Sequence, residues 1–199
     1  LFFFIKPMIR AAKFVVKDKV DARMPENMFD EKLIHESPSL ALEFVRKTLL
    51  YMGSIVKDYF VMVREYSFKE NSKTVEEANT YEMMIDTYDQ KLHDYLIKIS
   101  QAGLDANDSK KLSRDLDTIK DFERIGDHLT NLVLLKMGVT ELLYFQSIPS
   151  KVTLNEYIEI SKFYSTPKSN IFINGILDKI VEKFKADKRL IKTGRGLLE

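Results

Sequence analysis

Residues 74–103, TVEEANTYEMMIDTYDQKLHDYLIKISQAG, carry the most regular apolar pattern in the chain. The apolar side chains recur at steps of three and four residues, which places them on one side of an α-helix. They are Ala78, Tyr81, Ile85, Tyr88, Leu92, Tyr95, Leu96 and Ile99. Thr74 followed by Glu77 is a capping pattern at a helix start, and Gly103 favours a helix end. The stretch therefore predicts one long amphipathic helix.

Similar helices are predicted on both sides of this stretch. Ser37-Pro38 suits a helix start, and an apolar stripe follows it over residues 40–68. A cap at residues 105–108 precedes a third stripe over residues 112–133. Each helix is expected to have roughly 28 residues, or about 40 Å at 1.5 Å per residue. Because the connections are short, successive helices must be antiparallel neighbours, so an all-α, antiparallel three-helix bundle is expected.

The chain divides into three expected parts. Residues 37–137 form the bundle, and residues 138–199 form shorter C-terminal helices at 153–164 and 170–185. Residues 1–36 are expected to be a membrane-proximal basic segment and an extended linker. Their apolar start and the basic residues after it are typical of the cytoplasmic end of a membrane helix. A helix packed on the domain is the alternative for this segment.

Charge is distributed unevenly along the chain. Residues 1–23 hold six Lys or Arg against two Asp or Glu, and residues 179–199 hold seven against three, whereas the part between is acidic. An acidic body argues against nucleic acid as the main partner. Basic ends suit an anionic membrane surface, or are simply solvated termini. The absence of Cys excludes disulfides and thiolate metal sites.

No arrangement of residues indicates catalysis. The three His lie in different predicted elements, and there is no nucleophile motif, HExxH zinc signature or glycine-rich phosphate loop. An enzyme is therefore not expected.

Two acidic pairs are the candidate site. Glu82 and Asp86 lie four apart on one predicted helix, and Glu123 and Asp127 lie four apart on the next. Each pair projects from one helix face, where like charges repel by roughly 0.2–0.5 kcal/mol. A divalent cation, of unidentified element, would offset that repulsion. Further ligands could come from Asp89, His93, Asp121, His128 and Asn131. A solvated acidic face without metal is the alternative.

These motifs resemble those of the PhoU family of phosphate-uptake regulators. The similar runs are Glu82-Met83-Met84-Ile85-Asp86 and Asp121-Phe122-Glu123-Arg124-Ile125-Gly126-Asp127-His128. Residues 29–42 also resemble the start of the PhoU-like C-terminal domain of bacterial sodium/phosphate cotransporter-related proteins. The resemblance covers about residues 25–135, and residues 138–199 lack a second pair of motifs.

The resemblance implies a PhoU-like three-helix bundle that holds divalent metal at Glu82, Asp86, Glu123 and Asp127. It implies a regulatory domain of a sodium/phosphate cotransporter-type protein at the cytoplasmic face of the cell membrane. The expected partners are the transporter domain, the membrane surface or a second copy in a homo-dimer, and not nucleic acid. The alternatives are a structural or dimerising helical module without ligand, and a soluble PhoU-like regulator of a separate phosphate transporter.

Overall fold

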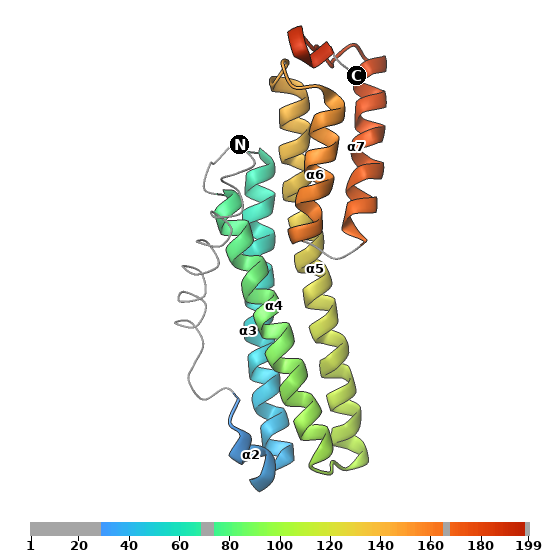
Figure 1. The fold of residues 1–199 in the computed structure, drawn as a ribbon. Helices are drawn as coiled ribbons and strands as arrows, with labels where there is room; N and C mark the ends of the chain where they lie inside the picture. Colours follow the sequence, from blue (N-terminus) through green and yellow to red (C-terminus); the bar gives the residue numbers. More distant parts are fainter. Residues whose placement is uncertain (1–28, 69–73, 165–167, 198–199) are drawn as a thin grey trace. The chain divides into compact units, whose positions relative to one another are not determined.

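The computed structural model describes residues 29–68, 74–164 and 168–197, and these ranges are all-α (Figure 1). The helices are α2 (Glu31–Glu36), α3 (Pro38–Phe68), α4 (Thr74–Gln101), α5 (Ala106–Tyr144), α6 (Ser150–Tyr164) and α7 (Ser169–Ala186), followed by the 3₁₀ turn η1 (Gly194–Leu197). The expected all-α fold, with three long helices before shorter ones, is confirmed.

The predicted helix boundaries are confirmed where the sequence supplies a cap. Helix α3 begins at Pro38, as its Ser-Pro start predicts. Gly103 follows α4 with a φ of 82°, a backbone conformation that glycine adopts without steric strain. The side chain of Asp105 then accepts hydrogen bonds from the amides of Asn107 at 2.8 Å and Asp108 at 2.7 Å. Those bonds satisfy amides that have no partner within the first turn of α5.

Two predictions of helical extent are wrong. Residues 31–36 form α2 instead of an extended linker, because Asp30 caps the helix and Ile34 is buried. Helix α5 has 39 residues and runs on to Tyr144, beyond residue 137, where the bundle was expected to end. A Cβ at Gly138 would come within 3.3 Å of Leu177, so this glycine lies at a tight packing position inside a helix.

The predicted membrane exit at residues 1–23 lies outside the described residues. Among the described helices, none has the length and apolar composition that a membrane crossing requires.

The described residues form two compact units. Unit 1 comprises residues 29–56 and 83–123, and unit 2 comprises residues 57–68, 74–82, 124–164 and 168–197. In unit 1, Tyr51 of α3 and Tyr88 of α4 meet edge to face, with ring centroids 5.6 Å apart. The core around them is apolar and fully buried, and includes Leu42, Met52, Ile85, Leu92, Leu96, Ile99 and Ile119. All of these except Leu42 belong to the stripes that the sequence predicts, whereas Leu40, at the start of the first stripe, is exposed.

Unit 2 has its own core, in which the later part of α5 packs with α6 and α7 (Figure 1). The core residues are Leu134, Leu135, Leu142, Leu154, Tyr157, Ile173 and Leu177. At the start of α7, the side-chain amide of buried Asn131 donates a hydrogen bond to the hydroxyl of Ser169 at 3.0 Å. This bond links α5 to α7.

Candidate functional site

The four predicted metal ligands fall in different surroundings. Glu82 and Asp127 belong to unit 2, whereas Asp86 and Glu123 belong to unit 1. Asp86 is exposed, and the other three are partly buried. Within the described ranges, no group of three or more His, Asp and Glu side chains is arranged to hold a metal ion. The four-carboxylate metal site stays a prediction that rests on sequence spacing.

The charges of Glu82 and Asp127 affect the pKa of one buried tyrosine, Tyr59. The hydroxyls of Tyr59 and Thr130 are hydrogen bonded at 2.9 Å, and the Tyr59 ring stacks on Tyr81 with centroids 5.3 Å apart. Burial raises the pKa of Tyr59, the Thr130 hydrogen bond opposes this, and the charges of Glu82 and Asp127 add to the rise. The charges of these two carboxylates therefore reach the hydroxyl of a buried tyrosine of unit 2.

Three of the five additional ligands proposed have partners within the protein. Asn131 bonds to Ser169, as described above, and Nδ1 of His93 lies 3.3 Å from Oδ1 of Asp89 one turn away. Burial raises the pKa of Asp89, and the nearby His93 opposes that rise. Asp121 and His128 are exposed.

The metal prediction has a direct test in thermal unfolding. If the four carboxylates bind a cation, millimolar Mn²⁺, Mg²⁺ or Zn²⁺ should raise the melting temperature, because a ligand that binds only the folded state stabilises it. The double variant Glu123→Gln/Asp127→Asn should lose most of that rise while remaining folded without metal. An equal rise in the variant would place the cation elsewhere, and no rise in the wild type would contradict the prediction.

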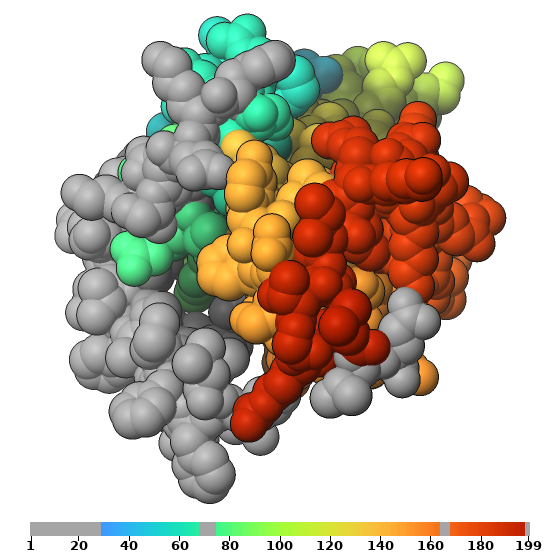
Figure 2. Space-filling view, turned by 90° about the horizontal axis from the view of Figure 1, so that it is seen from above, coloured from blue at the N-terminus to red at the C-terminus, as the bar shows by residue number. Residues whose placement is uncertain are grey.

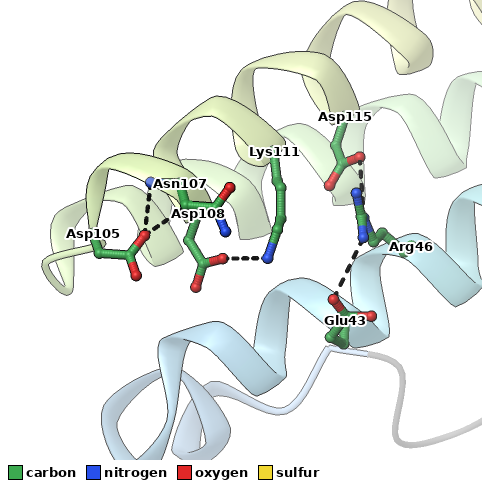
Figure 3. Close-up of polar contacts among 7 residues, drawn as sticks. All are labelled: Glu43, Arg46, Asp105, Asn107, Asp108, Lys111 and Asp115. Atoms are coloured by element: carbon green, nitrogen blue, oxygen red, sulfur yellow. Dashed lines mark hydrogen bonds and ion pairs between the residues drawn. The ribbon is translucent and has the colours of Figure 1, made fainter.

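Unit 1 holds a cluster of charged side chains between α3 and α5 (Figure 3). Lys111 donates to Asp108 at 2.6 Å, and this hydrogen bond lowers the pKa of Asp108. Arg46 lies 3.5 Å from Glu43 and 3.9 Å from Oδ1 of Asp115. The second oxygen of Asp115, Oδ2, is buried without a hydrogen-bond partner. The cluster links α3 to α5, but the buried carboxylate of Asp115 has a hydrogen-bond partner missing at Oδ2.

Asp115 should make the fold less stable as it ionises. Burial raises its pKa, Arg46 opposes this and Glu43 adds to the rise. A carboxyl with a raised folded-state pKa supports the fold fully below the unfolded pKa of about 3.9, and this support is lost as pH rises through the folded-state pKa. From pH 3 to 7 the wild type should therefore lose stability relative to Asp115→Asn in urea unfolding.

Asp117→Asn is the matched control for this comparison, since Asp117 is exposed on the same helix. Parallel pH profiles for the wild type and Asp115→Asn would show that the buried carboxylate does not titrate in this range.

A second polar region lies at the end of unit 2, where the chain after α7 folds back on the α5–α6 turn. Figure 2 shows this C-terminal segment in red, beside the gold atoms of the turn. The amide of Thr193 donates to the carbonyl of Gln146 at 3.0 Å, and the amine of Lys192 donates to the carbonyl of Phe145 at 3.2 Å. A Cβ on Gly196 would overlap the carbonyl oxygen of Gln146. The segment is therefore in close backbone contact with the turn.

This fold-back forms an open pocket of ≈ 510 Å³, named here the C-terminal pocket. It is lined by Ser150, Lys185, Leu190, Ile191, Lys192, Gly196 and Leu197. Burial lowers the pKa of the Lys192 amine, and the charge of Glu141 opposes that shift. Sequence analysis recognised the basic charge of residues 179–199 but assigned it to a membrane surface or to solvated termini. The pocket had no local sequence signal, because residues from two separate segments build it.

Comparison with known proteins gives a family that the motifs did not indicate. The sequence model of the NusB family matches residues 62–182. The Transcription antitermination protein NusB of Salinibacter ruber is 52% identical over 65 residues, which are 33% of this chain and 41% of that protein. The protein of the same name from Chloroherpeton thalassium is 47% identical over 66 residues, 33% of this chain and 31% of that protein.

A third relative of that name, from Clostridium botulinum, is 51% identical over 53 residues, 27% of this chain and 40% of that protein. The chain thus spans less than half the length of these curated relatives. No solved structure matches the chain.

The NusB match shows that the PhoU resemblance is wrong, since it covers more than half of the chain. The runs that carry the resemblance are acidic pairs at helical spacing, a pattern that many amphipathic helices contain. A role in phosphate transport or its regulation is therefore wrong as well, and neither alternative, a ligand-free helical module or a soluble PhoU-like regulator, is supported.

The expected partners and location are corrected by the same finding. The names of the relatives refer to transcription, which contradicts a membrane transporter partner, a place at the cytoplasmic face of the membrane and the exclusion of nucleic acid. The charge argument had treated the basic residues 179–199 as a chain end, whereas they belong to unit 2.

Proposed function

Because the chain belongs to the NusB family, we propose that it acts in transcription antitermination and contacts RNA in the transcription complex. The family match and the names of the three curated relatives support this proposal. An antitermination protein acts on a polymerase that is making RNA, so its surroundings are rich in phosphate. The proposed role is that of a binding protein and not of an enzyme.

The observation that carries the RNA contact is the basic C-terminal segment, defined as residues 179–197. It holds seven Lys or Arg against Glu182 and Asp187, and all seven except Lys192 are exposed. The seven are Lys179, Lys183, Lys185, Lys188, Arg189, Lys192 and Arg195. Lys and Arg that contact phosphates release bound counterions, which is the main source of sequence-independent affinity for nucleic acid.

Two exposed aromatic residues stand where α5 ends. Tyr144 ends α5 with 74% of its surface exposed, and Phe145 follows it with 55% exposed. The backbone carbonyl of Phe145 accepts the hydrogen bond from Lys192, so these residues adjoin the basic segment along the chain's fold-back. Exposed aromatic rings next to basic residues favour single-stranded nucleic acid, whose bases stack on such rings. RNA in single-stranded form is therefore the expected ligand.

Charge removal from the segment tests the RNA contact. In the triple variant Lys183→Gln/Lys188→Gln/Arg195→Gln, affinity for a single-stranded RNA should fall at least about tenfold at low salt. The slope of log affinity against log salt should decrease in size by about 2, which is the contribution of three phosphate contacts on a single strand. Fluorescence anisotropy of a labelled RNA over a range of salt concentrations measures both quantities.

The control removes the same charge from other helices. Lys32, Lys57 and Lys110 are exposed on α2, α3 and α5, so the triple change of these lysines to Gln matches the loss of net charge. Equal weakening in both triple variants would mean that net charge alone governs binding. A wild type that binds no RNA would contradict the proposed contact.

A further inference from the structure

The C-terminal pocket has the size and the construction of a small-ligand site. Its volume of ≈ 510 Å³ lies within the range of about 300–1,000 Å³ that is usual for ligand pockets. Its walls are fixed by backbone contacts, namely the hydrogen bond from Thr193 to Gln146 and the close approach of Gly196 to the same carbonyl. Because the backbone positions these walls, the pocket exists before a ligand arrives.

The charged groups of the pocket suit a dianion. Lys185 and Lys192 both line it, and the only other polar side chain among its lining residues is Ser150. Ser150 is also the first residue of the 15-residue helix α6, and the start of a helix favours negative charge. A phosphate monoester carries up to two negative charges, and lysines bind such groups by charge-assisted hydrogen bonds.

The remaining lining residues favour a flat apolar group beside the phosphate. Leu190, Ile191 and Leu197 form this wall, and Ile191 and Leu197 are both more than half exposed. A nucleoside base can cover these two side chains, and the removal of their apolar surface from water favours binding. Gly196 is buried against the carbonyl of Gln146, so it contributes backbone and no side chain to this wall.

We propose that the C-terminal pocket binds a nucleoside monophosphate, with its phosphate at Lys185 and Lys192 and its base against Ile191 and Leu197. The ligand can be a free mononucleotide or the phosphorylated end of an RNA, because both present the same chemical groups. The site goes beyond the proposed role in antitermination. Lys183, Lys188 and Arg195 do not line the pocket, so the nucleotide proposal can fail while the proposed RNA contact holds, and the reverse.

Titration of the full chain with adenosine monophosphate tests the site. Calorimetry should show binding at least tenfold tighter than that of adenosine, since adenosine lacks the phosphate. In two-dimensional NMR spectra, the amides of Ser150, Ile191, Lys192 and Leu197 should shift during the titration. Equal affinity for adenosine, or shifts confined to other residues, would overturn the proposal.

Substitutions separate the pocket from general charge. Lys192→Ala should weaken binding of the nucleotide at least tenfold, whereas Lys162→Ala should change it less than twofold. Lys162 is an exposed lysine of α6, twelve residues from Ser150 and hence about 18 Å along the helix. Equal effects of the two variants would overturn the proposal. Gly196→Ala should also weaken binding, since it displaces a wall without altering charge.

Two RNAs that differ only in a 5′-phosphate identify the source of the ligand. Tighter binding of the phosphorylated RNA, with competition by adenosine monophosphate, supports the site and assigns it to RNA ends. Equal binding of both RNAs, together with nucleotide binding that Lys192→Ala abolishes, supports the site and assigns it to free nucleotides. RNA binding that persists without any nucleotide binding overturns the pocket proposal and leaves the RNA contact intact.

Discussion

Leu177→Ala should lower the free energy of unfolding by about 2–5 kcal/mol, because it removes buried methyl groups and leaves a cavity. Leu177 is fully buried in the core of unit 2 and contacts the backbone region of α5 at Gly138. Its neighbours belong to α5 and α6 as well as α7, so a shift of one helix cannot easily fill the cavity that the substitution leaves. Urea denaturation followed by circular dichroism measures the change.

Ile171→Ala is the matched control for Leu177→Ala. Ile171 lies on the same helix with 72% of its surface exposed, so its removal should change stability by no more than about 0.5 kcal/mol. A loss below about 1 kcal/mol for Leu177→Ala would show that α7 is not packed on α5 and α6 as described.

Gly196→Ala should destabilise the fold-back of the C-terminal segment by about 1–3 kcal/mol, the usual effect of overfilling a packed position. The added Cβ would overlap the backbone carbonyl of Gln146, which cannot move aside as a flexible side chain would. Displacement of the segment breaks the hydrogen bond from the Thr193 amide to that carbonyl. Hydrogen exchange of the Thr193 amide should therefore become at least about fivefold faster, because each 1.4 kcal/mol is a factor of ten.

Gly175→Ala should stabilise the fold, whereas Gly196→Ala should destabilise the C-terminal segment. Gly175 lies inside α7, and a Cβ there meets no atom within 4 Å. Alanine in a helix interior is more favourable than glycine by roughly 0.5–1 kcal/mol, so this variant should be more stable than the wild type. Unchanged exchange at Thr193 in Gly196→Ala would contradict the described backbone contact.

The long helices could be predicted because their information is local. Apolar stripes, the Ser37-Pro38 start and the cap at Asp105 each act within one or two turns, and the structure confirms all three. The length of α5 could not be predicted in the same way. The bundle was expected to end at residue 137, but α5 continues through Gly138, which packs against Leu177 and Tyr157 farther along the chain.

The candidate site was less predictable than the fold. Glu82 and Asp127 were predicted as ligands from their spacing and from the PhoU resemblance, neither of which indicates that their charges also affect the buried Tyr59. The C-terminal pocket depends on the contact of Gly196 with Gln146, and a single glycine in a sequence does not reveal its tertiary neighbour. The basic charge of the segment was visible, but the acidic body of the chain led the charge argument to a membrane surface or solvated termini and away from nucleic acid.

A transcription assay tests the proposed function most directly. Purified chain is added to a bacterial transcription system that lacks its own NusB protein, on a template with a terminator downstream of an antitermination signal. The wild type should increase the fraction of transcripts that extend past the terminator. The triple variant Lys183→Gln/Lys188→Gln/Arg195→Gln should give a smaller increase in this fraction. The control, with Lys32, Lys57 and Lys110 changed to Gln, should give a larger increase than that variant. No increase in readthrough with the wild-type chain would contradict a role in antitermination.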